Sequence, residues 1–313
     1  MKDQLLEIIQ RNDHIVIFGH INPDGDCYGS QVGLQQIILE NYPGKHVYIV
    51  GTGMPRFYNK LGKMDVVSDE ILKDSLAIIV DCSAFNRLEV KGAEKAKEHI
   101  IFDHHIENPD TLKCPKILDK NKIAASEIIA DWALKNDLRI NKIAAEALFL
   151  GITTDSGGFR YKNTTNNTFF IAGKLVETGF SVPDFYNVLQ RSTERDLALQ
   201  GFLLSKYKKT KNGFIYVTFA QNNIKKLGID SNSAASRVNI LANIENFPVW
   251  GTFTEYPDGV YRVELRSSGL NIQPIAVKFG GGGHANACGI TRLDANLLDD
   301  LLVEIENFLK ENK

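Results

Sequence analysis

The sequence lacks both a large excess of one charge and a long apolar run. Its 36 lysine and arginine residues nearly balance 38 acidic residues, so the formal net charge is only −2. This balance excludes a protein that holds long nucleic acid on a large basic surface, but it permits a local pocket for a small phosphate-bearing ligand. No stretch of about 18 apolar residues is present, so no membrane-spanning helix is expected. The first residues also lack the apolar run of a signal peptide.

Cysteine is scarce, and repeats and low-complexity segments are absent. The four cysteines show no C-x-x-C spacing and are scattered at Cys27, Cys82, Cys114 and Cys288. We interpret them as reduced thiols, mostly small buried side chains, in a cytoplasmic protein. With 43% hydrophobic and 24% charged residues, a chain of 313 residues predicts about two ordinary globular domains.

The first half of the chain alternates short apolar runs with helical patterns. Strands are predicted at residues 14–18, 47–50, 77–80 and 99–102. Helices are predicted at residues 30–40, 126–135 and 142–150. This alternation predicts an α/β domain whose mostly parallel sheet is flanked by helices.

The second half begins with a helical stretch and then returns to strands. Helices are predicted at residues 165–178, 182–189, 194–205, 272–279 and 294–310, and strands at 214–219, 249–255 and 260–266. We therefore expect a catalytic domain at residues 1–190, a connecting helix and linker at 191–212, and a smaller α/β domain at 213–313. The active site is expected in the cleft between the two domains.

Four polar clusters each follow an apolar run of the first domain. They are GHINPDGD at residues 19–26, Asp81, DHH at residues 103–105, and Asp155. Ligands of open parallel sheets bind outside the carboxyl ends of the strands, so the first three clusters are expected in one crevice. Asp155 would join them from the loop after the helix at 142–150.

Such a gathering of carboxylates favours metal binding. Carboxylates within a few ångströms repel one another, and one or more would stay protonated at neutral pH unless cations were present. Two divalent ions would balance four carboxylates, and mixed imidazole and carboxylate donors suit Mn²⁺, Fe²⁺, Co²⁺ or Zn²⁺ better than Mg²⁺. Taken alone, each residue is an ordinary turn or cap residue. Their joint occurrence indicates a two-metal site for phosphoryl transfer.

A run of four glycines at residues 280–283 precedes His284 in the second domain. Glycine lets backbone N–H groups approach an anion closely, and a helix start nearby would add its dipole. Arg266, upstream of the run, can bind a phosphate through two parallel hydrogen bonds. A flexible loop and a solvated charge are the alternative interpretations. The combination favours a phosphate cradle.

Taken together, these motifs resemble the DHH phosphoesterase family with its DHHA1 C-terminal domain. HINPDGD, Asp81, DHH, TTDSGGF and GGGGHANACG occur in the family's order and cover nearly the whole chain. The length resembles the nanoRNase and pAp-phosphatase branch. That branch degrades very short oligonucleotides and dephosphorylates 3′-phosphoadenosine 5′-phosphate (pAp), while some relatives hydrolyse pApA or cyclic di-AMP. The resemblance implies a metal-dependent hydrolase of ester bonds.

The resemblance also implies roles for individual residues, beginning with two Mn²⁺ ions. The first ion would be held by His20, Asp24 and Asp81. The second would be held by Asp26, Asp81, His104 and Asp155. Asp81 would therefore bridge the two ions.

The remaining implied roles concern the substrate. His105 would face its phosphate or help to protonate the leaving oxygen, and Asp103 would orient a histidine ring. Substrate would be bound in the second domain by Arg266, Ser268, Asn271, Gly281, Gly282, Gly283, His284 and Asn286. Cys27 and Cys82 depart from the expected pattern without removing a metal ligand. A thiol at either position would increase sensitivity to oxidation or to soft metals.

Three other functions compete with this interpretation. An inorganic pyrophosphatase or exopolyphosphatase would carry a Ser-Arg-Lys signature in its C-terminal domain, and the glycine run argues against it. An exonuclease that degrades long single-stranded nucleic acid would be a longer protein, and it would need a groove of stacking and charged residues along which the nucleic acid binds. A nucleotide-binding sensor would keep the cradle but lose part of the metal cluster. We expect a short oligonucleotide or nucleotide as substrate and no membrane partner. The sequence does not decide whether the protein forms a homodimer. It also does not decide whether the physiological substrate is pAp, pApA, cyclic di-AMP or short RNA.

Overall fold

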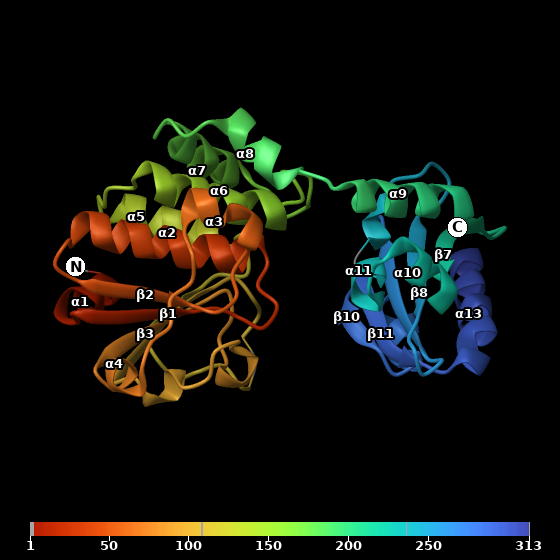
Figure 1. Cartoon of the computed structure of the whole chain (residues 1–313), viewed down its shortest axis with the longest axis horizontal. Helices are drawn as coiled ribbons and strands as arrows, with labels where there is room; N and C mark the ends of the chain where they lie inside the picture. Colours follow the sequence, from red (N-terminus) through yellow and green to blue (C-terminus); the bar gives the residue numbers. More distant parts are fainter. Residues whose placement is uncertain (1–2, 108, 236, 313) are drawn as a thin grey trace. The chain divides into compact units, whose positions relative to one another are not determined.

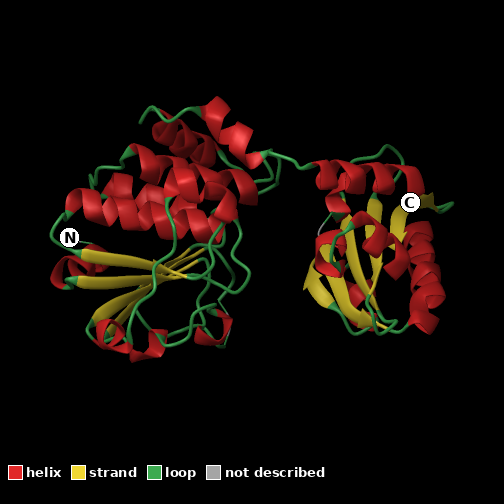
Figure 2. Ribbon diagram, in the orientation of Figure 1, coloured by secondary structure: helices red, strands yellow, loops and turns green. Residues whose placement is uncertain are grey.

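The computed structural model describes residues 3–107, 109–235 and 237–312. The chain divides into two compact units, Met1–Arg191 and Ser192–Lys313. Each unit contains its own β-sheet with helices packed on it (Figures 1 and 2), which confirms the predicted α/β class. Among the described residues, no helix is both long and apolar enough to cross a lipid bilayer.

The sheet of the first unit is parallel throughout. Its strands are β1 (His14–Phe18), β2 (His46–Val50), β3 (Ser75–Val80), β4 (Glu98–Asp103) and β5 (Lys116–Leu118). They lie in the order β2-β1-β3-β4-β5, so the direction of winding changes between β1 and β3. The loops that follow two such strands diverge and leave a crevice for ligands. Here those loops carry the motif at residues 19–26 and Asp81.

Alternation along the strands divides the apolar side chains between two faces of this sheet. Ile17 of β1 joins the larger core, and its neighbour Phe18 joins the smaller one. The larger core lies between the sheet and helices α2 (Gly25–Asn41), α5 (Ala125–Lys135) and α6 (Lys142–Asp155), which cover one face in Figure 1. Burial on both faces explains why the strands read as nearly continuous apolar runs.

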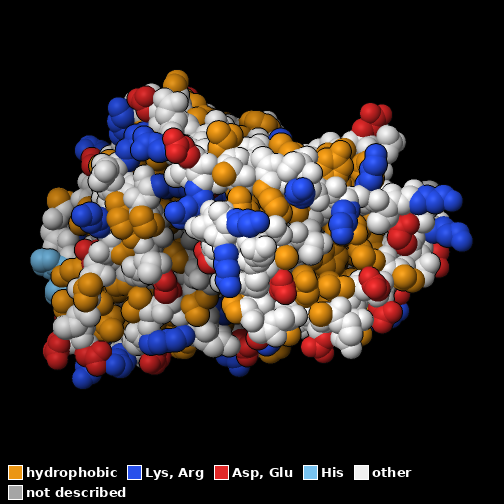
Figure 3. Space-filling view, turned by 45° about the vertical axis from the view of Figure 1, so that its right-hand side comes forward, with side chains coloured by type: hydrophobic (Ala, Val, Ile, Leu, Met, Phe, Trp, Pro, Cys, Tyr) orange, Lys and Arg blue, Asp and Glu red, His pale blue; other side chains and the backbone are white. Residues whose placement is uncertain are grey.

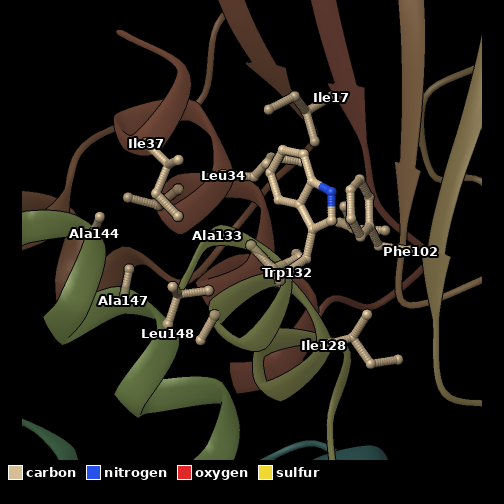
Figure 4. Close-up of a cluster of buried hydrophobic side chains, with 14 of the residues drawn as sticks. Ile17, Leu34, Ile37, Phe102, Ile128, Trp132, Ala133, Ala144, Ala147 and Leu148 are labelled. Carbon is tan, nitrogen blue, oxygen red and sulfur yellow. The ribbon is translucent and has the colours of Figure 1, made fainter. Parts of the chain in front are cut away.

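Figure 4 shows the centre of the larger core. The indole ring of Trp132 on α5 meets the ring of Phe102 on β4 edge-on, with centroids 5.2 Å apart. The other helices of the unit are α1 (Gln4–Arg11), α3 (Tyr58–Leu61), α4 (Asp69–Lys73), α7 (Asn166–Val176) and α8 (Val182–Leu189). We did not predict α1, α3, α4 or β5 from the sequence.

Two helix boundaries differ from the prediction in a way that affects the site. We expected a helix at residues 30–40, but α2 begins at Gly25, directly after the capping residue Asp24. We also expected Asp155 in a loop, but α6 continues through it. Glycine and threonine at residues 151–154 are weak helix formers, and packing against α2 and α5 overrides this propensity.

Glycines allow α2 and α6 to pack closely. Gly25, Gly29 and Gly33 recur every fourth residue of α2, and a Cβ atom added to any of them would collide with an atom of α6. At Gly29 the obstacle is the backbone carbonyl oxygen of Ala147, which cannot turn aside as a flexible side chain would. This contact holds the start of α2 beside the end of α6, where the acidic residues lie.

We expect Gly29→Ala to destabilise the first unit by about 1–3 kcal/mol, because the added methyl group overpacks the helix contact. A matched control is Gly173→Ala in α7, where a Cβ would meet open space. That change should stabilise the protein by up to about 1 kcal/mol through helix propensity. Thermal unfolding followed by circular dichroism measures both variants. Equal melting temperatures for the two variants would show that the α2–α6 contact is not tight.

The second unit contains a mixed six-stranded sheet. Its strands are β6 (Lys208–Lys209), β7 (Phe214–Phe219), β8 (Val249–Glu255), β9 (Tyr261–Ser267), β10 (Gly282–His284) and β11 (Ala287–Leu293). They lie in the order β10-β11-β9-β8-β7-β6, and only the pair β7–β8 is parallel. The helices are α9 (Glu194–Lys206), α10 (Gln221–Leu227), α11 (Ser231–Ala235), α12 (Gln273–Lys278) and α13 (Leu298–Glu311).

Two cores lie on the opposite faces of this second sheet. Leu199 and Leu203 of α9 pack in one core, so this helix is part of the second unit. Leu301 and Ile305 of α13 pack in the other. The glycine run does not lead into a helix: α12 ends before it, and its last two glycines belong to β10, which forms a hairpin with β11. The helix dipole considered for the phosphate cradle is therefore absent there.

Candidate functional site

The N-terminus of α2 places two aspartates in the crevice of the first unit. Asp24 caps the helix, and its Oδ1 atom accepts the backbone N–H groups of Asp26 and Cys27, both at 3.0 Å. Asp26 is fully buried, and its carboxylate accepts the N–H groups of Ala125 at 2.7 Å and Ser126 at 2.9 Å. Four backbone donors thus hold the two carboxylates in fixed orientations.

Asp81 lies at the centre of the cluster. It follows β3 with φ = 57°, a left-handed conformation that costs free energy for any residue with a side chain and is typical of functional sites. Its side chain is nearly inaccessible, yet its Oδ1 atom accepts no hydrogen bond from the described residues. A buried carboxylate oxygen without a donor is unfavourable, and a bound cation would remove that cost.

Two histidines approach Asp81 from different sides. His20 Nε2 lies 3.2 Å from Asp81 Oδ2 and 3.8 Å from Asp24 Oδ1. His104 Nε2 lies 3.3 Å from Asp81 Oδ1 and 3.5 Å from Asp155 Oδ2. Each carboxylate oxygen of Asp81 therefore faces its own imidazole, an arrangement suited to a carboxylate that bridges two ions.

The tautomer of His20 also favours a cation. Its Nδ1 atom lies 2.9 Å from the carbonyl oxygen of Ile21, which only accepts, so Nδ1 is the protonated nitrogen. In the neutral ring the lone pair of Nε2 then points at the carboxylates of Asp24 and Asp81. Lone pairs facing one another require a proton or a metal ion between them.

The shifted pKa values of the cluster have the same cause. Burial and the charge of Asp81 raise the pKa of Asp26 to about 7. Burial and the charges of Asp26 and Asp24 raise the pKa of Asp155 to about 9. Burial opposes the charged form of His104, but Asp81 and the other carboxylates raise its pKa to about 10. The metal-free cluster therefore holds protons that bound divalent ions would displace.

His105 and Asp103 form a separate pair. Asp103 Oδ1 accepts the ring Nδ1–H of His105 at 2.7 Å and its backbone N–H at 3.1 Å. The Nε2 atom of His105 is thereby left as the free ring nitrogen, on a side chain that remains about one-third exposed. His105 is thus held in one orientation and can reach a bound molecule.

The clusters that could hold a metal ion contain five of the six predicted ligands and two further residues, Cys27 and His105. Three groups have donor atoms within 4.8 Å of one another: His20, Cys27 and Asp81; Asp81, His104 and His105; and Asp26, His104 and Asp155. Asp24 adjoins the first group through His20. The sequence analysis noted Cys27 as a thiol near the site but did not predict it as a donor.

A pocket of about 250 Å³ lies within the second unit. Of the predicted substrate-binding residues, Arg266, Gly282 and Gly283 line it, together with Arg262 and Glu264, which the sequence analysis missed. The alternation of side chains along β9 could have indicated both residues from the sequence, because residues 262, 264 and 266 point to the same face of the sheet. These side chains make the pocket polar and positively charged.

Glu264 holds both arginines of this pocket. Its Oε1 atom accepts from Arg262 Nε at 2.8 Å, and its Oε2 atom accepts from Arg266 Nη1 at 3.3 Å. Arg266 Nη1 also donates to the carbonyl oxygen of Leu265 at 2.8 Å. One side of the Arg266 guanidinium is therefore fixed to the protein, while its Nε and Nη2 donors make no hydrogen bond to the described residues.

The other predicted substrate-binding residues do not line this pocket. Asn286 donates to Ser267 Oγ at 2.9 Å and to the carbonyl oxygen of Leu270 at 3.0 Å, which ties the hairpin to the end of β9 and the loop after it. Ser268 contacts the carbonyl oxygen of Pro248, and Asn271 Oδ1 accepts the backbone N–H of Gln273, the first residue of α12, at 3.3 Å. Gly281 packs against β11, and His284 is exposed on β10.

Comparison with known families agrees with this geometry. The family model for the DHH family N-terminal domain matches residues 14–152, and the model for the DHHA1 domain matches residues 211–311. The chain belongs to the DHH family. The resemblance stated from the motifs is thereby confirmed. The cluster that could hold metal ions lies within the matched DHH residues except for Asp155, whereas the arginine pocket lies within the matched DHHA1 residues.

The chain is similar over nearly its whole length to other proteins. The bifunctional oligoribonuclease and PAP phosphatase NrnA of Mycoplasma pneumoniae is 35% identical over 91% of this chain and 90% of its own length. The Bacillus subtilis protein of the same name is 31% identical over the full length of both. A solved exopolyphosphatase-related protein from Bacteroides fragilis superposes with a TM-score of 0.84, at 24% identity and over 98% of this chain and 97% of its own, which supports the fold.

Proposed function

We propose that this DHH protein is an Mn²⁺-dependent phosphoesterase that hydrolyses short oligonucleotides and pAp by a two-metal mechanism. The observation that carries the proposal is the placement of Asp81, whose two oxygens face His20 and His104 separately. The names of the Mycoplasma pneumoniae and Bacillus subtilis relatives support the substrate class.

The donors divide between two ion positions. His20, Asp24 and Asp81 would hold the first ion, and Asp26, Asp81, His104 and Asp155 would hold the second. Bound there, the ions would activate water and stabilise charge on the leaving oxygen. The buried N–H groups at the starts of α2 and α5 keep the carboxylates in place without occupying all of their lone pairs.

The remaining polar residues of the site would act on the substrate. In its imidazolium form His105 would keep its Nδ1–H on Asp103 and donate its Nε2 proton to the leaving oxygen, which leaves the neutral imidazole. In the DHHA1 domain, Arg266 would bind a phosphate with its free donors, and the backbone of Gly282 and Gly283 would lie beside it. We also propose His284, Gly281, Ser268, Asn271 and Asn286 as weaker contributors to substrate binding.

The charge of the chain supports a small substrate. Acidic and basic side chains lie among one another on the face drawn in Figure 3, in keeping with the net charge of −2. Long nucleic acid is held mainly by many phosphate contacts to basic residues, so affinity for it requires an excess of positive charge.

A substrate panel tests the function. Purified protein with Mn²⁺ is assayed on pAp, pApA, cyclic di-AMP, pyrophosphate and oligoribonucleotides of increasing length. We expect turnover of pAp and of the shortest oligonucleotides, with rates that fall as length increases. Turnover of pyrophosphate alone would replace the proposal with a pyrophosphatase, and nucleotide binding without any turnover would replace it with a sensor.

We expect Arg266→Lys to raise the KM for pAp by about tenfold or more. Lysine keeps the charge but loses the forked geometry, and a hydrogen bond to a charged group contributes about 1.5–3 kcal/mol. Arg292→Lys is the matched control, because Arg292 is exposed on β11 and pairs with Asp258 outside the pocket. Steady-state kinetics of both variants measure the effect, and equal KM values would remove Arg266 from substrate binding.

A further inference from the structure

The Cys27 thiol lies among the donors of the first metal position. Its sulfur, a ring nitrogen of His20 and a carboxylate oxygen of Asp81 all lie within 4.8 Å of one another. Donors on opposite sides of one ion, with bonds of about 2.1–2.3 Å, are separated by up to about 4.6 Å. Small adjustments would therefore allow these three atoms to contact one ion.

Two features of the backbone fix Cys27 in this place. Its N–H group donates to Asp24 Oδ1 at 3.0 Å, which ties it to another donor of the same position. Its sulfur lies so close to Gly19 that a Cβ atom there would collide with it. The side chain is fully buried and is located in the first turn of α2.

A second observation indicates that a ligand belongs at this point. His20, which shares the group with Cys27, directs its Nδ1–H at the carbonyl oxygen of Ile21, so the lone pair of its Nε2 atom faces Asp81 Oδ2 at 3.2 Å and Asp24 Oδ1 at 3.8 Å. Lone pairs that face one another require a proton or a metal ion between them, so the thiol adjoins a position suited to a cation.

We propose that Cys27 is a fourth donor of the first metal position and gives it affinity for thiophilic divalent ions such as Co²⁺, Zn²⁺ and Cd²⁺. This inference rests on the proposed metal centre. When such an ion binds, a metal–sulfur bond forms, the S–H bond breaks and the proton passes to the solvent, with no change of oxidation state. Soft sulfur ligands favour these ions over Mn²⁺, which prefers oxygen and nitrogen.

The additional donor has a consequence for activity. Four protein donors complete the tetrahedral shell of Zn²⁺ and leave no position for water or substrate, as in structural zinc sites. Mn²⁺ has little affinity for sulfur and would leave the thiol unbound. The first position thus accepts an activating ion without sulfur and an inhibiting ion with it.

Cobalt spectroscopy tests this assignment without a measurement of turnover. Metal-free protein is titrated with Co²⁺, and sulfur coordination is read from the near-ultraviolet charge-transfer band. Cys27→Ala and Cys27→Ser remove the proposed donor. Cys82→Ala is the matched control, because Cys82 is also buried and follows Asp81 but belongs to no donor group among the described residues. We expect the band in the wild type and in Cys82→Ala, and its loss in both Cys27 variants.

Each other outcome overturns the assignment. Bound Co²⁺ without the band in the wild type would show that Cys27 is not a ligand, and this result does not depend on whether a variant folds. A band that persists in Cys27→Ala would assign the sulfur to another cysteine. Failure of the protein to bind Co²⁺ would remove the metal position itself.

Metal affinities separate coordination by the thiol from a purely structural role. We expect Cys27→Ala to weaken Cd²⁺ binding by about tenfold or more and Mn²⁺ binding by less than about threefold, as measured by competition with a chromophoric chelator. Equal losses for both ions would overturn the proposal. Hydrolysis of pAp with Mn²⁺ in a wild type without the sulfur band would refute only the role of Cys27, whereas the band without hydrolysis would refute only the proposed function.

Discussion

Asp81→Asn is expected to abolish hydrolysis, with kcat/KM at least about a thousandfold lower, and to reduce Mn²⁺ occupancy at both positions. One carboxylate would serve both ions, so the loss of its charge affects them together. Asparagine is the appropriate replacement because it retains the shape and tolerates the left-handed backbone at φ = 57°, where alanine would add strain. Metal content of the dialysed protein and steady-state rates measure the two effects.

Thermal stability provides the control for Asp81→Asn. In the metal-free protein the substitution should change the melting temperature little, because it relieves repulsion from the buried carboxylate of Asp26 but also removes the attraction to His104. Mn²⁺ at about a hundred times its dissociation constant should stabilise the wild type by about 2.7 kcal/mol and the variant much less. Two bound ions and wild-type turnover in the variant would exclude Asp81 from the centre.

His104→Ala and His105→Ala are expected to fail in different ways. His105→Ala should lower kcat by about 10²- to 10⁴-fold with little loss of metal, because its free ring nitrogen would act on the substrate as a general acid. His104→Ala should lose the ion at the second position, because its Nε2 atom lies within 3.8 Å of Asp26, Asp81 and Asp155. Metal analysis alongside single-turnover rates distinguishes the two variants.

The adjacent positions of the two histidines make each variant the control for the other. Both lie in the loop after β4, and their rings lie 4.6 Å apart, so general disruption of the loop would affect both variants equally. Equal metal loss in the two variants would show that His105 is a ligand as well. That result is compatible with the donor group formed by Asp81, His104 and His105, and it would move general acid catalysis to another residue.

The sequence predicted the sheet and the gathering of the acidic motifs for one physical reason. Strands buried on both faces must be apolar throughout, so β1, β3 and β4 are visible as short hydrophobic runs. The carboxyl ends of parallel strands meet at one edge of a sheet, so polar residues that follow these runs come together there. His20, Asp81 and His104 could thus be placed in one site from their positions alone.

The local structure around Asp155 could not be predicted from the sequence. Local propensity favoured the end of the helix before residues 151–154, but α6 continues through them because Gly151 fits closely against Ser126 and Asp26. This contact depends in part on the side chain of Asp26, which lies more than a hundred residues before Gly151 in the sequence. Helix propensity depends only on neighbouring residues in the sequence, so it cannot predict such a contact.

The sequence by itself determined the α/β class, the parallel sheet and the residue types of a metal centre, because these follow from hydrophobic periodicity and from the chemistry of carboxylate and imidazole. Only the tertiary structure decided that the Cys27 sulfur joins His20 and Asp81, and that Glu264 holds Arg262 and Arg266 in one pocket. Coordination and hydrogen bonding depend on separations of a few ångströms. Those separations are set by how closely helices and strands pack, which the order of residues along the chain does not specify.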